Sequence, residues 1–224
     1  LLLGVYSLVW GFPAPLIFAL LLNELYNKKF KRLVQSISYM PYFISTVVIV
    51  GILKSFSGKE GLFNQVRSII GLEPILFFQE PEYFRSLFIA SGIWQGLGFG
   101  SIIYLAALSN INPELYDSAV IDGANRFQRV IYVTLPSILP TITILLILSV
   151  GGILGTDTQK VLLMYNPLTY ETADVIGTYI YREGLMATRY SYGTAIGLVL
   201  NTISFIFVAI FNKIAQKISE TSLW

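Results

Sequence analysis

The side chains that most often carry out catalysis are scarce in this sequence. It contains no Cys and no His, which excludes thiol nucleophiles, disulfides, catalytic triads that need His, and zinc sites with Cys or His ligands. The remaining polar and aromatic candidates lie within or beside apolar stretches, where a polar group is costly unless it has a function. Those that we select as candidates for contacting a passing ligand are Tyr42, Trp94, Gln95, Ser101, Tyr104, Asp157 and Asn201.

The spacing of these candidates limits which of them can act together. Trp94, Ser101 and Tyr104 are separated by seven and three residues, so on a helix they lie close to one face, whereas the neighbouring Gln95 points elsewhere. Each candidate has a structural alternative, which is a hydrogen bond between packed helices or an anchor at a membrane interface. Asp157 and Lys160 could contact an incoming ligand or a protein that delivers it, or they could simply be solvated ends.

The composition indicates which elements position these residues. Of 224 residues, 54% are hydrophobic and only 12% are charged, the latter roughly half the share of a soluble domain. A soluble core of this size cannot bury so much apolar surface, so lipid must be part of the solvent. The net charge of +2 is too small to indicate a nucleic-acid partner.

Five apolar stretches approach the length of about 20 residues that crosses hydrocarbon as a helix. They lack the alternation of barrel strands, so we expect an all-α, polytopic transmembrane helical bundle in a single domain over residues 1–224. The chain opens with Leu1 inside an apolar stretch, and we expect one further helix ahead of it. The expected spans are 1–22, 38–53, 86–108, 135–154 and 193–210.

Basic residues set the expected orientation, because loops rich in Lys and Arg stay in the cytoplasm. The short first loop and the C-terminal tail are both basic, and five spans place them on the same side. We therefore expect residues 54–85 and 155–192 to lie outside. The residues that decide this orientation are Lys28, Lys29, Lys31, Arg32, Lys213 and Lys217.

The cytoplasmic stretch between the third and fourth spans has the signals of a short helix over about 113–123. Asn112 suits the N-cap, Pro113 the first helical position and Glu114 the positive helix end, whereas Gly123 suits the position after the C-cap. A short, capped, exposed helix has a shape that another protein could grip. The alternative is a plain connector.

The third span contains glycines at every fourth position, namely Gly92, Gly96 and Gly100. This spacing favours close packing against another helix. The alternative is that these glycines leave a gap that lines a pore.

This stretch resembles the EAA motif of permeases of ATP-binding-cassette (ABC) importers. The family pattern is Glu-Ala-Ala, three residues, Gly, nine residues and Ile-x-Leu-Pro; here Asp117-Ser-Ala precedes Gly123, and Val133-Thr-Leu-Pro136 follows. Asp117, Ser118 and Val133 are conservative departures. The resemblance implies that the helix is a coupling helix, which sits in a cleft of an ATPase subunit. The residues implied to make that contact are Glu114, Tyr116, Asp117, Ser118, Ala119, Asp122, Gly123, Ala124 and Arg126.

The similarity extends over essentially the whole chain and is closest to permeases for polysaccharides and oligosaccharides, of the lipoprotein-linked and alginate-importer types. It implies a multi-pass permease of the type I importer fold in the bacterial plasma membrane. Such a permease is a transport subunit and not an enzyme. The implied partners are a second homologous permease, two cytoplasmic ATPases and an extracellular substrate-binding protein. The segments that carry it include Asn23–Leu25, Phe30–Arg32, Tyr39–Phe43, Leu163–Pro167, Asp174–Tyr179 and Ser222–Trp224.

The resemblance also implies an oligosaccharide as cargo, with the candidates Tyr42, Trp94, Gln95, Ser101 and Tyr104 supplying aromatic faces and hydrogen bonds for sugar rings. No cofactor or metal is expected on this chain. Its nearest P-loop lookalike, residues 51–59, has its glycines too far apart and is followed by Glu60 in place of Ser or Thr. ATP and Mg²⁺ are therefore expected on the partner ATPases.

Two other functions remain as alternatives. A secondary transporter or channel is disfavoured because no span has a charged residue near its middle to carry a coupled ion. An intramembrane aspartyl protease is a remote alternative, since Tyr116-Asp117 and Gly155-Thr-Asp157 faintly resemble its paired motifs. The second motif lacks a Gly, and Asp117 lies in a polar loop rather than a span.

Overall fold

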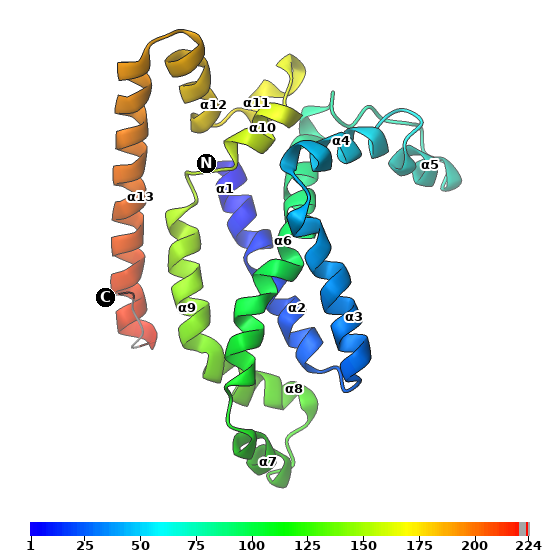
Figure 1. Cartoon of the computed structure of the whole chain (residues 1–224), viewed down its shortest axis with the longest axis vertical. Coiled ribbons are helices and arrows are strands. Elements are labelled where there is room, and N and C mark those ends of the chain that lie inside the picture. The colour runs from blue at the N-terminus through cyan, green and yellow to red at the C-terminus, as the bar shows by residue number, and fades with distance from the viewer. Residues whose placement is uncertain (220–222, 224) are drawn as a thin grey trace.

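The computed structural model describes residues 1–219 and residue 223, and the described residues form helices, turns and loops without a β-strand. Four helices are long and apolar enough to cross a membrane, and a bent helix pair raises the number of candidate spans to five. Figure 1 shows α7 at one end of the molecule, and α4, α5, α10, α11 and α12 near the other. The expected all-α membrane bundle is confirmed. Ser222 and Trp224 lie outside the described residues.

Several of the candidate spans are built from more than one helical segment. The first span joins α1, η1 and α2, the second region joins α3, η2 and α4, and the fourth span joins α8, η3 and α9. In chain order these elements are α1 (Leu2–Tyr6), η1 (Ser7–Gly11), α2 (Pro13–Asn23), α3 (Lys28–Tyr39), η2 (Met40–Phe43), α4 (Thr46–Phe56), α6 (Pro81–Ser109), α8 (Arg126–Arg129), η3 (Val130–Thr134), α9 (Leu135–Gly151) and α13 (Tyr190–Ser219).

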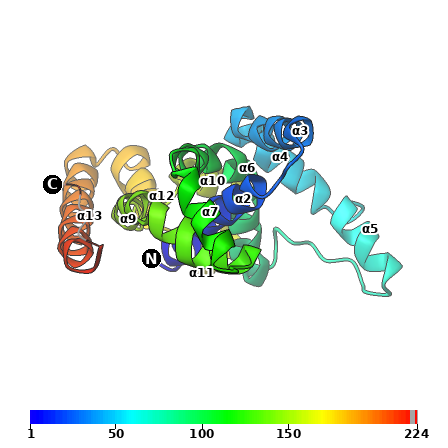
Figure 2. The same ribbon diagram turned by 90° about the horizontal axis from the view of Figure 1, so that it is seen from below.

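Shorter helices connect the spans. At the end of the molecule that carries the long connecting segments these are α5 (Leu62–Ile69), α10 (Thr158–Met164), η4 (Pro167–Thr169), α11 (Tyr170–Ala173), α12 (Ile176–Ile180) and η5 (Tyr181–Met186), whereas α7 (Pro113–Ile121) stands at the opposite end. Seen from below, α5 extends away from the bundle and α13 lies at the opposite edge (Figure 2).

The span expected at 38–53 is not one straight helix. Residues 28–43 and 46–56 form two helices bent by 100°, because Pro41 lies in a 3₁₀ turn and Ser45 begins α4 by accepting a hydrogen bond from the Val48 N–H. In Figure 1, α3 runs alongside the long helices whereas α4 lies near their end, and the first turn of α3 carries the basic residues that the sequence assigned to a loop. Gln95 on α6 donates a hydrogen bond to the Ile44 carbonyl at 3.2 Å and ties down the bend.

The other expected spans coincide with helices whose ends differ. Expected span 86–108 lies inside α6, and 193–210 lies inside α13, because polar residues continue these helices past their apolar parts. The fourth span begins at Arg126 and ends at Gly151, in place of 135–154. Its early start follows from a capping box in which the side chains of Asn125 and Gln128 each bond the other's backbone N–H.

Two of the spans widen to a π-helical turn directly before a proline. η1 ends two residues before Pro13, and η3 ends two residues before Pro136. Proline has no backbone N–H and its ring collides with the carbonyl four residues earlier. A π-turn accommodates both effects without breaking the helix, so the first and fourth spans remain continuous.

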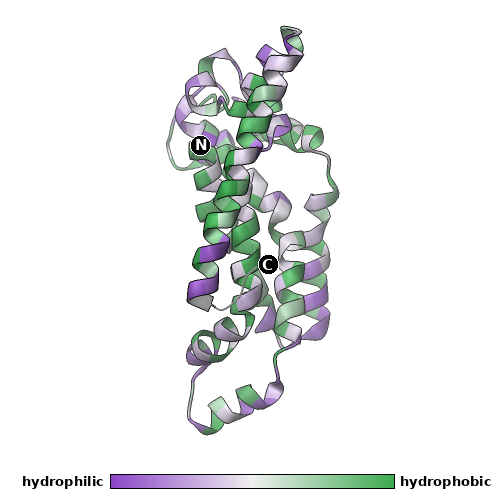
Figure 3. Ribbon diagram, turned by 90° about the vertical axis from the view of Figure 1, so that its left-hand side faces the viewer, coloured by the Kyte–Doolittle hydropathy of each residue, from purple (hydrophilic) through white to green (hydrophobic). Residues whose placement is uncertain are grey.

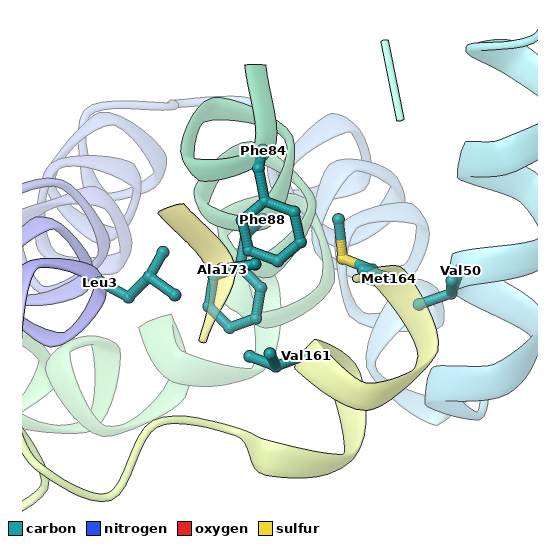
Figure 4. Packing of buried hydrophobic residues seen from close by; sticks show 7 residues of the cluster. All are labelled: Leu3, Val50, Phe84, Phe88, Val161, Met164 and Ala173. Atoms are coloured by element: carbon teal, nitrogen blue, oxygen red, sulfur yellow. The ribbon is translucent and has the colours of Figure 1, made fainter. Parts of the chain in front are cut away.

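Two groups of buried apolar side chains hold the bundle together. At the end that carries α4, α10 and α11, the cluster joins these helices to α1 and α6 (Figure 4) and consists of Leu3, Val50, Phe84, Phe88, Val161, Met164 and Ala173. Toward α7, the second cluster joins α2, α6 and α9 through Ala19, Tyr104, Leu108 and Ile138. Figure 3, coloured by hydropathy, shows many hydrophobic residues along the long helices between these ends, as expected for contact with lipid or another membrane subunit.

Candidate functional sites

The N-terminus of α7 is locked by its own side chains. The Asn112 side-chain oxygen accepts a hydrogen bond from the Glu114 N–H at 3.1 Å, and its amide donates to the Glu114 carboxylate at 3.1 Å. Pro113 occupies the first helical position. These contacts satisfy donors that a helix end otherwise leaves free, so the expected N-cap is confirmed.

The C-terminus of α7 ends in a Schellman motif. Gly123 has φ +79°, its N–H bonds the Val120 carbonyl at 3.0 Å, and the Ala124 N–H bonds the Ala119 carbonyl at 2.9 Å. A left-handed residue is needed at this position, and glycine adopts it without steric cost. The expected C-terminal glycine is confirmed, and α7 is a short, stiff helix with both ends fixed.

The surface of α7 is open and partly apolar. None of its residues is buried, and the exposed positions include Leu115, Val120 and Ile121, the last with 86% of its surface accessible. Figure 3 shows α7 hanging below the ends of the long helices on two connecting segments. Apolar side chains in such a position are suited to contact with another protein.

A side-chain hydrogen bond joins α7 to the fourth span. The Tyr116 hydroxyl lies 3.0 Å from the hydroxyl of Thr134, which is buried and also donates to the Arg129 carbonyl at 3.3 Å. Thr134 is the last residue of η3, directly before α9. Tyr116 is therefore positioned to transmit a displacement of α7 to α9.

The remaining residues expected to contact a partner divide by exposure. Ala119 and Ala124 are half-buried beside the C-terminal motif. Arg126 is exposed, and its guanidinium lies 5.2 Å from the centre of the Tyr26 ring. This cation–π contact links the α7–α8 turn to the α2–α3 turn. The positions left open to solvent are Glu114, Asp117, Ser118, Asp122, Gly123 and Arg126.

A cavity of about 680 Å³ lies among the first span, α6, α9 and the start of α10. Four of the seven expected ligand-contacting residues line it, namely Tyr42, Gln95, Tyr104 and Asp157. Tyr42 stacks on Phe99 with ring centres 3.9 Å apart. The cavity thus presents aromatic faces and polar atoms within an apolar wall.

The other three expected residues lie elsewhere. Trp94 has 48% of its surface accessible and does not line the cavity. Ser101 is fully buried and donates to the Gly98 carbonyl at 2.6 Å within its own helix. Asn201 faces a separate hollow along α13. Helical spacing placed Trp94 near the face of Tyr104, but the angular difference is enough to turn it outward.

The glycines of α6 have two different roles. Gly92, Gly96 and Gly100 line the cavity, which agrees with the pore-lining alternative. Gly100 also packs closely, because an added Cβ there would lie 3.1 Å from the ring of Pro15 on α2. The tightest approach of another helix to α6 is at Gly98, where an added Cβ would collide with the backbone carbonyl of Ser38 on α3. The regular four-residue spacing does not include Gly98.

Several cavity-lining groups were not selected from the sequence. Ser7, Thr46, Ser149 and Thr156 come from different elements, and no local pattern distinguishes them from other hydroxyl residues. Lys160 also lines the cavity and is buried, with 3% of its surface accessible. The sequence locates Lys160 near the end of a span, three residues after Asp157. Its burial could not be predicted from the sequence, because it depends on packing against α6.

The structure separates the two carboxylates of the remote protease alternative. Asp117 lies on α7 and Asp157 caps α10, and Figure 1 places these helices at opposite ends of the molecule. They therefore cannot share a proton. Among the residues that the structure describes, no cluster of three metal-binding side chains occurs.

The fold and these sites define a polytopic helical membrane protein with a cavity among its spans and an exposed, end-capped helix beyond them. Residues 11–218 match the model of the family described as binding-protein-dependent transport system inner membrane component. The chain belongs to this family. It is a permease subunit of an ABC importer in the bacterial plasma membrane and not a catalytic enzyme, which removes the secondary transporter and channel alternatives.

Curated relatives and solved structures agree with this assignment. Protein LplB of Bacillus subtilis is 38% identical over 225 residues, which cover all of this chain and 71% of that protein. The polygalacturonan/rhamnogalacturonan transport system permease protein YteP of Bacillus subtilis is 37% identical over 227 residues, covering all of this chain and 70% of YteP. A chain of a bacterial alginate ABC transporter, solved with an alginate pentasaccharide-bound periplasmic protein, matches with TM-score 0.96 and 44% identity over 99% of this chain and 77% of that chain.

Proposed function

We propose that this chain is the membrane-spanning subunit of an ATP-driven importer of oligosaccharides or polysaccharide fragments, and that α7 is its coupling helix. The observation that carries the proposal is the position of α7: both of its connections lead into helices that line the cavity. α6 carries Gln95 and Tyr104 on the cavity wall, and α9 carries Leu145 and Ser149. The sugar specificity is supported by the transport activities named for YteP and for the alginate transporter.

The proposed mechanism uses the stiffness of α7. When a partner ATPase binds ATP and moves, the capped helix follows as a unit, because its ends are fixed by Asn112 and Gly123. The Tyr116–Thr134 hydrogen bond passes this movement to α9. A rigid-body shift of α9 relative to the first span then changes which side of the cavity is open, and ATP binding acts as a population shift between two arrangements.

The proposed partners are a second homologous permease, two cytoplasmic ATPases that bind ATP and Mg²⁺, and an extracellular substrate-binding protein. The apolar part of α13 buries none of its residues within this chain, which leaves a long face for a second membrane subunit or lipid. The solved neighbour was captured with a periplasmic protein carrying its sugar. We place that delivery at the end of α4, α10 and α12, opposite α7.

Two matched glycine variants test the coupling helix. Gly123 and Gly71 both follow a helix in a Schellman motif, with φ of +79° and +77°, and neither has an atom within 4 Å of an added Cβ. Valine at either position costs about 1–3 kcal/mol of local strain. Only Gly123 lies beside α7, whereas Gly71 follows α5 at the other end.

We expect Gly123→Val to weaken association with the ATPases and to abolish most sugar-stimulated ATP hydrolysis in lipid nanodiscs. Gly71→Val should leave the ATPases bound. Co-purification and ATPase assays of the assembled complex measure both results, and the melting temperature of each variant controls for folding. Equal retention of the ATPases by both variants would show that α7 is only a connector.

A further inference from the structure

Lys160 places a positive charge in the wall of the cavity. It lies in the first turn of α10, is buried, and its ammonium group donates a hydrogen bond to the Phe88 carbonyl on α6 at 3.0 Å. The same nitrogen lies 4.7 Å from the centre of the Phe88 ring. Figure 4 shows Phe88 in the cluster with Val161, the residue after Lys160. This ammonium is therefore held in one place by two contacts with Phe88.

The charge of Lys160 has no carboxylate partner in the described part of the chain. Both ion pairs found there lie in the 174–189 region. Asp157 is the other charged residue of the cavity wall, but its Oδ1 accepts the Lys160 backbone N–H at 3.0 Å as the N-cap of α10. An ammonium group has three donors, and one carbonyl and one ring leave it incompletely satisfied.

The ammonium group is nevertheless the main form at neutral pH. Burial lowers the pKa of Lys160 to about 8, and the nearby Asp157 carboxylate opposes that shift. A buried charge that forms no direct ion pair is unfavourable and within a membrane protein is a candidate for function. The neighbouring Gly92 leaves room beside the nitrogen, because an added Cβ there would lie 3.4 Å from it.

We propose that Lys160 determines specificity for carboxylated sugars by pairing with a uronate carboxylate as the oligosaccharide passes through the cavity. This inference rests on the proposed function of the chain as a carbohydrate permease. A carboxylate is the group that completes the hydrogen bonding of a buried ammonium and neutralises its charge in one contact. Hydroxyl groups of a neutral sugar offer hydrogen bonds without that neutralisation.

Three variants separate this role from simple packing of α10 on α6. Lys160→Arg keeps the charge, Lys160→Gln keeps an N–H donor for the Phe88 carbonyl without the charge, and Lys160→Met keeps neither. A specificity role predicts that Gln and Met behave alike and that Arg resembles the native protein. A packing role predicts that Gln resembles the native protein more than Met does.

The assay uses the complete complex in liposomes with saturating substrate-binding protein, which is the same for all variants. The probes are oligogalacturonate and alginate oligosaccharides, compared with the same sugars after reduction of their carboxylates to alcohols. We expect Gln and Met to lower uptake of the carboxylated probes by about tenfold, the effect of about one charge-assisted hydrogen bond, and to leave uptake of any reduced sugar that is carried unchanged.

The outcomes are distinct. An equal loss for carboxylated and reduced sugars, or uptake of carboxylated probes that follows the order Lys, Gln, Met with Arg impaired, would overturn the specificity role in favour of packing. Uptake of neutral sugars alone by the native complex would overturn it while leaving the proposed importer intact. Failure of every carbohydrate probe to stimulate the native complex would reject the proposed function, and this inference with it.

Discussion

Tyr116 and Thr134 make the single side-chain hydrogen bond that joins α7 to the fourth span among the described residues, at 3.0 Å. Tyr116→Phe and Thr134→Val each remove it, and a part-buried hydrogen bond contributes about 0.5–1.5 kcal/mol. We expect each variant to lower sugar-stimulated ATP hydrolysis several-fold while the ATPases remain bound. Because both changes break the same bond, the double variant should be little worse than either single variant, as a double-mutant cycle measures.

A matched control lies on the same π-turn. Tyr132 has 75% of its surface accessible, so Tyr132→Phe removes a hydroxyl from the same element without breaking the link to α7. It should couple normally. Additive losses in the Tyr116 and Thr134 double variant would contradict a shared path through this hydrogen bond.

Single residues differ in how far the sequence predicts them. Asn112, Pro113 and Gly123 were assigned from local signals, because capping depends on neighbours a few residues away. Trp94 and Ser101 were not placed correctly in the cavity, because their directions depend on how α6 is rotated against α2 and α3. The burial of Lys160 likewise depends on Phe88, which is distant in sequence.

At the scale of elements, α3 approaches α6 most closely at Gly98. An added Cβ there meets the backbone of Ser38, whereas a Cβ at Gly96 meets nothing within 4 Å. Overpacking of a tight contact costs about 1–3 kcal/mol, so Gly98→Ala should lower the melting temperature of the purified complex. Gly96→Ala should leave the melting temperature unchanged or raise it slightly, since alanine is the better helix former and its Cβ meets no other atom. Equal melting temperatures for both variants would show that α3 moves aside at no cost.

The turn between α11 and α12 is braced by an ion pair. Arg182 donates to both carboxylate oxygens of Asp174 at 2.9 and 2.7 Å, and Thr178 also donates to this carboxylate. These contacts hold the pKa of Asp174 below its usual value, and the hydrogen bond from Arg182 has the largest effect. The ionised Asp174 therefore contributes to stability at pH values above the usual Asp pKa of about 3.9. This contribution is lost as the pH falls through the lowered pKa of Asp174.

We expect Asp174→Asn to loosen residues 170–186 by about 1 kcal/mol or less, because both side chains are about one third exposed and water screens the pair. Hydrogen–deuterium exchange of this segment at neutral pH measures the effect. Glu183→Gln is the control, since the Glu183–Arg189 pair is longer, at 3.4 Å, and more exposed. Faster exchange in the control than in Asp174→Asn would contradict the brace.

The elements themselves show where apolar patterning succeeds and fails. The first, third and fifth spans were expected from continuous apolar runs, and the helices agree. The run at 38–53 hid a bend of 100°, since Pro41 and Ser45 end one helix and begin another inside it. The polar first turn of α3 likewise hid that this helix begins at Lys28. Helix ends in a membrane protein follow caps and prolines as much as apolarity.

At the scale of the whole molecule, the exposed helix α7 is joined to the cavity among the spans by α6 and α9, which line that cavity and run between the two ends (Figure 1). A chain without cysteine allows this connection to be tested with one introduced thiol. Gly96→Cys places the thiol in the cavity wall, where no atom lies within 4 Å of the added Cβ. Trp94→Cys places it two residues away on an exposed face outside the cavity.

Alternating access predicts that a membrane-impermeant maleimide reaches Cys at position 96 from one side of oriented proteoliposomes without nucleotide, and from the other side when a non-hydrolysable ATP analogue closes the ATPases. Labelling at position 94 should not change with nucleotide, because that side chain points away from the cavity. Adding Gly123→Val should abolish the nucleotide effect at position 96, since the ATPases then no longer move α7. A nucleotide effect that survives this variant would mean that the movement reaches the cavity by a route other than α7.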